Sequence, residues 1–258
     1  GMRQLLVVGV IVLGLAPGAM ADGTFVWRNR EQDMREPQQK AFILYDEGVQ
    51  DLVLSVKYEG ATEDFGWLVP VPTWPEMAQV EGNLFEVLSK TMQEPFVIGC
   101  DLEPQTAGGE DLGVRATKHD VGIYDVFLLE GGYGAALEGW LERHGFFLPH
   151  GADSVLDHYA RRSWTLAAIH LDPDLVGERE HARLADGTIP PLRFRFAAPG
   201  PVFPLTISSL GQGESEILIY ALGTEPLAPA ATPGVQWEVR LKPWARSKPY
   251  IPETYWVD

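Results

Sequence analysis

Two apolar runs and the short turn between them decide the fold: Lys40–Tyr45 (KAFILY), Asp46–Gly48 (DEG) and Leu52–Tyr58 (LVLSVKY). Both runs are rich in aliphatic and aromatic residues, which favour strands. The turn has the composition of a short hairpin loop closed by a glycine at positive φ. Apolar residues alternate along the second run, so one face is expected to be buried and the other mostly wet. The stretch therefore predicts an antiparallel β-hairpin.

The next strand outward from this hairpin is Phe65–Pro72 (FGWLVPVP). Trp67 shares one predicted face of this strand with three apolar neighbours. Proline has no N–H to donate to a ladder, so Pro70 and Pro72 place the segment at a sheet edge or beyond its end.

Periodicity organises the rest of the chain. Helical spacing and capping residues predict three short helices, at residues 83–93, around 137–141 and at 153–159. Acidic and glycine-rich residues 101–118 predict a surface loop. Further strands are expected at 121–129, 164–171, 192–196, 202–207, 216–220 and 235–241. Strands, then helices, then strands indicate an α+β fold, mainly antiparallel, with about three short helices inserted mid-chain.

The N-terminal segment has the pattern of a signal peptide. Arg3 precedes an uncharged apolar run, Leu5–Ala16, and Ala19–Ala21 supplies the small-x-small cleavage pattern. A membrane-spanning helix needs about 20 apolar residues, so the run is short for an anchor. We therefore expect residues 1–21 to be a signal peptide and residues 22–258 a single α+β domain, in which a sub-domain boundary would fall within 172–190. The expected location is periplasmic or extracellular, without a stable membrane anchor after cleavage.

Charge and cysteine content limit the partners. The formal net charge of −16 repels phosphate backbones, which argues against nucleic acid. Cys100 is the only cysteine, so no intramolecular disulfide can form. A buried thiol is the favoured interpretation of this residue.

Three segments together resemble the bacterial domain-of-unknown-function family 2330. They span most of the chain, in order: Gln39–Ala41, Tyr45–Gly48, Asp51–Leu54, Tyr58–Gly60, Phe65–Trp67 and Val69–Pro72; then Gly139–Leu141, His144–Gly145, Leu148–Pro149, Tyr159 and Trp164; then Pro191–Phe194 and Val202–Leu205. The resemblance implies a secreted or envelope-associated bacterial protein. Relatives are associated with a cysteine-containing segment after the signal peptide, where this chain has Asp22–Phe25, so a disulfide or metal role for those cysteines could not operate here.

Motifs for metal binding and catalysis are absent from the sequence. His170, Asp172, Asp174, Glu178, Glu180 and His181 lie close in sequence but match neither an EF-hand nor H-E-x-x-H. We interpret this segment as a solvated acidic loop and expect no metal and no cofactor. No Gly-x-Ser-x-Gly elbow occurs. His119 and Asp120 are adjacent and would point to opposite sides of a strand, so they do not form an oriented pair. No catalytic residue is therefore assigned.

Aromatic and proline residues favour a binding module. Exposed tryptophans on rigid backbone suit sugar rings or extended peptides, and tryptophan is enriched at interfaces. The candidate ligand-binding residues are Trp67, Pro70, Pro72, Trp74, Trp244 and Trp256. Core packing is the favoured interpretation for Trp67, which shares a face with three apolar neighbours, and is as well supported as ligand contact for Trp244 and Trp256. The sequence thus favours a non-catalytic binding or structural protein of the bacterial cell envelope, partnered by a glycan, peptide or protein. An extracytoplasmic hydrolase of unrecognised type is the alternative.

Overall fold

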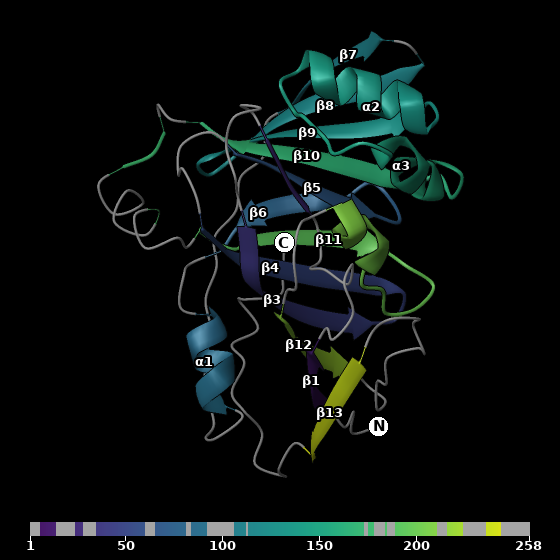
Figure 1. Ribbon diagram of the computed structural model, residues 1–258. Coiled ribbons are helices and arrows are strands. Elements are labelled where there is room, and N and C mark those ends of the chain that lie inside the picture. The colour runs from purple at the N-terminus through teal and green to yellow at the C-terminus, as the bar shows by residue number, and fades with distance from the viewer. Residues whose placement is uncertain are drawn as a thin grey trace.

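The computed structural model describes most of the chain (Figure 1). The described residues are 6–13, 24–27, 35–59, 65–80, 84–91, 106–111, 113–172, 175–177, 184, 189–210, 216–223 and 236–243. No helix among them is long and apolar enough to cross a membrane.

Two β-sheets form the framework. The first sheet contains, in spatial order, β13 (Gln236–Pro243), β1 (Leu6–Leu13), β12 (Glu216–Gly223), β3 (Arg35–Asp46), β4 (Val49–Glu59), β11 (Leu192–Ala197) and β6 (Glu76–Gln79). The second contains β2 (Thr24–Trp27), β5 (Phe65–Val71), β10 (Thr165–Leu171), β9 (Tyr124–Gly131), β8 (Val114–Val121) and β7 (Thr106–Asp111). Neighbouring strands are antiparallel except β12 and β3, which are parallel. The predicted α+β, mainly antiparallel class is confirmed.

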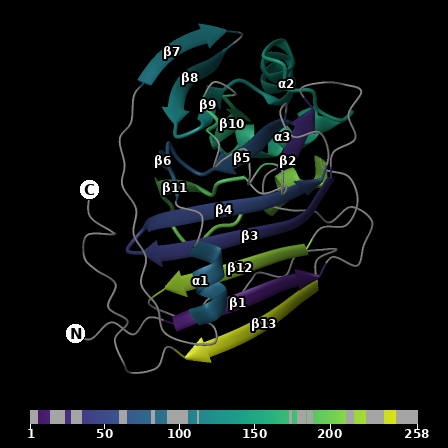
Figure 2. The same cartoon turned by 90° about the vertical axis from the view of Figure 1, so that its left-hand side faces the viewer.

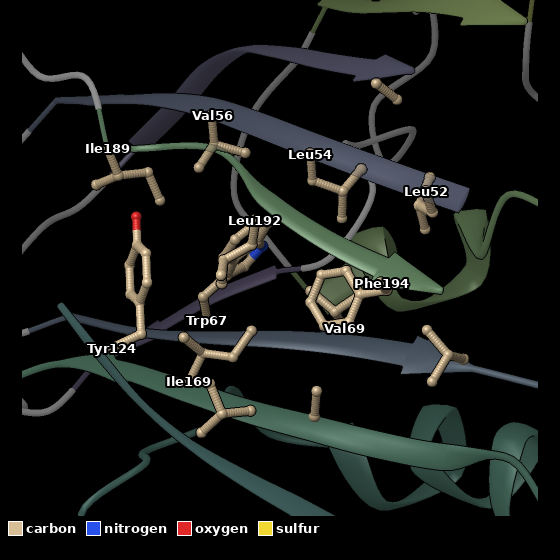
Figure 3. Packing of buried hydrophobic residues seen from close by; sticks show 14 of the residues in the cluster. Leu52, Leu54, Val56, Trp67, Val69, Tyr124, Ile169, Ile189, Leu192 and Phe194 are labelled. Atoms are coloured by element: carbon tan, nitrogen blue, oxygen red, sulfur yellow. The ribbon is translucent and has the colours of Figure 1, made fainter. Parts of the chain in front are cut away.

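The sheets pack face to face over a large apolar core (Figure 3). Alternate residues of each strand point into it, because side chains in a strand alternate between faces. From the first sheet these include Leu52, Leu54, Leu192 and Phe194, and from the second Trp67, Val69, Tyr124, Val126 and Ile169.

Helices cover the two outer faces (Figures 1 and 2). Helices α2 (Gly134–Arg143) and α3 (Ala152–Ala160) pack on the second sheet through a core that includes Leu129 and Leu166. Helix α1 (Leu84–Thr91) packs on the first sheet against Phe42 and Val53. The outer face of β4 is therefore less wet than its sequence pattern predicts. The three predicted short helices are present at the expected places.

The predicted hairpin is confirmed as β3 and β4. Glu47 and Gly48, the two residues of its turn, have φ values of 46° and 89°. Two successive positive φ values define the tight turn whose twist matches that of antiparallel strands. The pairing runs without interruption from Gln38 and Lys57 to Asp46 and Val49.

Pro70, the proline of β5, lies where the strand has only one neighbouring strand. β2 pairs with β5 only over residues 65–68, so Pro70 has a single registered neighbour, Leu166 of β10. The missing N–H at Pro70 consequently breaks no hydrogen bond to β2. The expectation of an edge position is correct for this end of the strand.

Two segments differ from their sequence-based predictions. Residues 106–111 and 114–118 lie in the β7–β8 hairpin rather than in a surface loop, because pairing of β8 with β9 overrides their weak strand propensity. Residues 205–210 form a 3-10 helix, η1 (Leu205–Leu210), rather than continuing the strand expected over 202–207. Pro204 removes one of the N–H donors that a strand there would need, and Pro201 immediately precedes the segment.

The predicted signal peptide contains strand β1, which pairs over its whole length with β12 and with β13. Cleavage after Ala21 would therefore leave β12 with β3 as its ladder partner and would separate β13 from the strand it pairs with. Cleavage itself stays a prediction.

Gly134 allows α2 and α3 to touch. Its N–H donates to Asp157 Oδ1 at 2.7 Å, and this bond, together with Arg161, lowers the pKa of the Asp157 carboxyl. A Cβ at this position would lie 1.9 Å from the carbonyl oxygen of Asp153. Any side chain there would force the helices apart.

We expect Gly134→Ala to lower the free energy of unfolding by about 1–3 kcal/mol, as overpacking does in a tight contact. Urea unfolding followed by circular dichroism measures this. Gly139→Ala is the matched control in the same helix, because a Cβ there would meet only the Arg143 side chain, at 3.5 Å. The control should be neutral or stabilising by up to about 1 kcal/mol. Equal destabilisation by both substitutions would contradict the close contact.

Candidate functional site

The candidate ligand-binding residues separate into buried and exposed ones. Trp67 is fully buried between the sheets, and Pro70 is buried as well. Trp67 is thus a core residue that offers no surface to a ligand, because both faces of β5 are covered. Pro72 is half-buried, and Trp74 is 41% exposed. Trp244 and Trp256 lie outside the described residues.

Trp74 sits on the short loop that carries the chain from the second sheet to the first. The loop leaves β5 after Val71 and enters β6 at Glu76. Prolines at 72 and 75 restrict its backbone, and Pro75 is buried. The Thr73 hydroxyl donates to the carbonyl oxygen of Ala197 at 2.9 Å. The loop is therefore fixed at both ends and in the middle, with the indole directed outward.

His119 of β8 lies against this indole. The ring centroids are 5.9 Å apart at an interplanar angle of 61°, an edge contact. His119 is 8% exposed, and in the described part of the chain its buried Nε2 atom has no hydrogen-bond partner. Burial lowers the pKa of His119, and the nearby Asp120 charge opposes this shift more weakly. The imidazole is therefore neutral at neutral pH.

A hydrogen bond between a backbone amide and a glutamine side chain holds the end of β8 beside β6. The N–H of Ile123, which with Gly122 forms the β8–β9 turn, donates to Gln79 Oε1 of β6 at 2.9 Å. Gly122 has φ of +61°, and a Cβ there would lie 1.9 Å from the same Gln79 oxygen. The hydrogen bond from Ile123 to Gln79 thus links the two sheets near Trp74 and His119. We call these two residues the Trp74–His119 site.

A second polar group lies on the outer face of the second sheet. Asp120, Asp125 and His170 are aligned across β8, β9 and β10. Lys118 Nζ lies 2.8 Å from Asp125 Oδ1 and 3.1 Å from Asp120 Oδ1. These contacts raise the pKa of Lys118, with Asp125 the larger cause, and the Lys118 contact lowers the pKa of Asp120. Asp120 and His119 face opposite sides of β8, as the sequence predicts.

His170 is held within this group by its own chain. Its Nε2 lies 3.5 Å from Asp125 Oδ2, and its Nδ1 lies 3.0 Å from the Leu171 carbonyl oxygen. The ring stacks on Phe127 with centroids 6.0 Å apart. Both ring nitrogens lie beside acceptors, so these contacts hold the imidazole in place. They favour a structural role for His170 over that of a base that takes a proton from a substrate.

A buried charge cluster lies on the outer face of the first sheet. The Asp51 side chain is 5% exposed and accepts from Arg193 Nε at 2.7 Å and from Arg195 Nη1 at 3.0 Å. The strict alternation of β11 places these arginines opposite the buried Phe194 and Phe196, as predicted. The cluster joins β4 to β11 and so supports the strand that pairs with β6.

The acidic segment of 170–181 is only partly described. His170 and Asp172 lie in the described residues, whereas 174, 178, 180 and 181 do not. Within the part of the chain that the structure describes, no group of three or more His, Cys, Asp or Glu side chains is arranged to hold a metal ion.

Sequence reasoning selected Trp74 but missed His119. The tryptophan stands out locally because it lies between two prolines. His119 carries no such signal, since its contact with Trp74 arises from the packing of one sheet on the other.

The fold and this site define an α+β protein of two packed sheets with an exposed tryptophan beside a buried, neutral imidazole. The chain belongs to the family described as "Uncharacterized protein conserved in bacteria" (DUF2330), whose model matches residues 16–241. The resemblance of the three segments is thereby confirmed. No protein of curated function matches the chain, and no solved structure does.

Proposed function

We propose that this chain is an exported, non-catalytic binding protein of the bacterial cell envelope, which contacts an envelope component through Trp74. Membership of a bacterial family supports the bacterial setting. The signal-peptide pattern of residues 1–21 supports export to the periplasm or cell surface.

The exposure of Trp74 is the observation that carries this proposal. Among the described residues the exposed large hydrophobic side chains are Trp74, Tyr133 and Leu175. Trp74 stands on a loop that contains two prolines and is hydrogen-bonded to the end of β11 through Thr73. A rigid tryptophan offers large contact area at a low cost in side-chain entropy, which is why tryptophan is enriched among energetically dominant contact residues.

An extracytoplasmic hydrolase is the second candidate, and the pairing of Asp125 with His170 favours it. A carboxylate beside an imidazole is the orienting half of a nucleophile-activating triad. Both ring nitrogens of His170 nevertheless lie beside acceptors of the chain itself, so the binding function has the stronger support.

Co-sedimentation of the purified protein with isolated bacterial cell envelopes tests the proposal. We expect Trp74→Ala to weaken the apparent affinity at least about 10-fold, the loss typical of an interface residue worth more than 1.4 kcal/mol. Tyr133→Ala is the matched control, because Tyr133 is 65% exposed and lies before α2, on another part of the surface. Equal retention of wild-type protein and Trp74→Ala would refute the role of Trp74. Hydrolysis products released from the envelopes would instead support the hydrolase.

A further inference from the structure

The Trp74–His119 site combines two different recognition elements. The exposed part of the indole offers a flat apolar surface. The imidazole beside it has a buried Nε2 without a hydrogen-bond partner in the described residues. A buried polar atom that lacks a partner is unfavourable, so such an atom next to an exposed aromatic ring marks a place where a ligand can satisfy it.

The charges around the site disfavour an anionic ligand, and the neutral imidazole offers a cation no partner. Glu76 ends the Trp74 loop and is exposed, and the whole chain carries a net charge of −16, so anions are repelled. A cation would pair with the exposed carboxylate of Glu76 and would leave the neutral imidazole of His119 unsatisfied. The group that Nε2 accommodates best is a hydroxyl, which can donate or accept according to the tautomer of the ring.

From this geometry we propose that the Trp74–His119 site binds a neutral sugar ring of an envelope glycan. The apolar face of the ring stacks on Trp74, and one ring hydroxyl hydrogen-bonds to His119 Nε2. Nε2 is buried, so this hydrogen bond requires the Trp74 side chain to turn aside on its fixed loop when the sugar binds. The inference rests on the proposed binding function and specifies the ligand of the same site.

A peptide ligand fits the site less well. Proline-rich segments bind in grooves lined by several aromatic side chains, whereas the other exposed large hydrophobic residues in the described part of the chain, Tyr133 and Leu175, belong to different segments. A strand added to a sheet edge would use backbone groups and would leave the His119 nitrogen unsatisfied. A single platform beside a single polar atom matches the size of one sugar ring.

Titration of the purified full chain with defined ligands tests the inference by calorimetry and tryptophan fluorescence. The probes are neutral tetrasaccharides of glucose and of N-acetylglucosamine, an anionic tetrasaccharide of galacturonate, and an uncharged proline-rich peptide. We expect at least one neutral tetrasaccharide to bind, with Kd weakened at least about 10-fold by Trp74→Ala. His119→Phe should weaken it about 2–10-fold, the effect of one neutral hydrogen bond, without lowering Tm. Tyr133→Ala should leave Kd unchanged.

The outcomes separate this inference from the proposed function. Binding of the peptide or the anionic sugar that is lost in Trp74→Ala, with no neutral sugar bound, would overturn the glycan inference and retain the binding function. Sugar binding that His119→Phe leaves unchanged would overturn the role of the imidazole. Failure of every probe here, together with Trp74-independent retention on envelopes, would refute both proposals.

Discussion

Asp51→Asn is expected to lower the free energy of unfolding by about 3 kcal/mol. The substitution removes the one carboxylate between two guanidinium groups and leaves their like charges facing each other in a largely buried place. Removing one partner of a buried ion pair costs about 3–5 kcal/mol, and the lower end applies because the Arg195 side chain is 34% exposed. Urea unfolding at neutral pH measures the change.

Glu76→Gln is the matched control for this charge cluster. Glu76 lies opposite Arg195 in the β6–β11 register, yet the described residues contain no ion pair of Glu76 within 4.0 Å. An exposed carboxylate of this kind contributes within about 0.5 kcal/mol of zero. A fall of similar size in Asp51→Asn and Glu76→Gln would show that Asp51 is not the residue that binds β4 to β11.

Trp67→Ala is expected to destabilise the protein by about 3–5 kcal/mol, the range for truncating a fully buried tryptophan. Its side chain fills the space between the sheets, beside Leu192 and Ile169 (Figure 3). Trp74→Ala should cost less, about 1 kcal/mol, because its side chain is 41% exposed and packs only in part, against His119. Chemical unfolding of both variants distinguishes the core tryptophan from the contact tryptophan. A stable Trp67→Ala protein that no longer binds envelopes would reverse the two assignments.

Local patterns explain which parts of the fold could be predicted. The β3–β4 hairpin follows from alternation and from Glu47-Gly48, because residues near in sequence determine it. The β7–β8 hairpin could not be found in this way. Its residues include Gly108 and Gly109, and its place is fixed by pairing of β8 with β9.

The burial of Trp67 shows that local sequence patterns are also insufficient to predict which residues bind a ligand. The face of β5 that carries Trp67 reads as apolar, and the opposite face includes Leu68. Only the packing of the first sheet on one side, and of α2 and α3 on the other, makes the strand buried on both faces. The apolar face of the segment favours a core position for Trp67, and long-range packing decides that the opposite face is buried as well.

The candidate site was predictable in one of its two residues. Pro72, Trp74 and Pro75 lie together in the sequence and indicate a rigid aromatic loop. The partner imidazole comes from β8 of the second sheet, and the hydrogen bond from Ile123 to Gln79 holds the β8–β9 turn beside β6. The contact between Trp74 and His119 cannot be predicted from residue spacing, because it depends on how the strands pack in three dimensions.

Fluorine NMR of protein labelled with 5-fluorotryptophan tests the central claim, that Trp74 is the ligand contact, most directly. The chain has eight tryptophans, and Trp74→Phe and Trp67→Phe assign the two resonances that matter. On addition of soluble envelope glycan fragments, the Trp74 resonance should shift in a saturable way while the Trp67 resonance stays in place. An unmoved Trp74 resonance, with shifts at other tryptophans or at none, would contradict the claim.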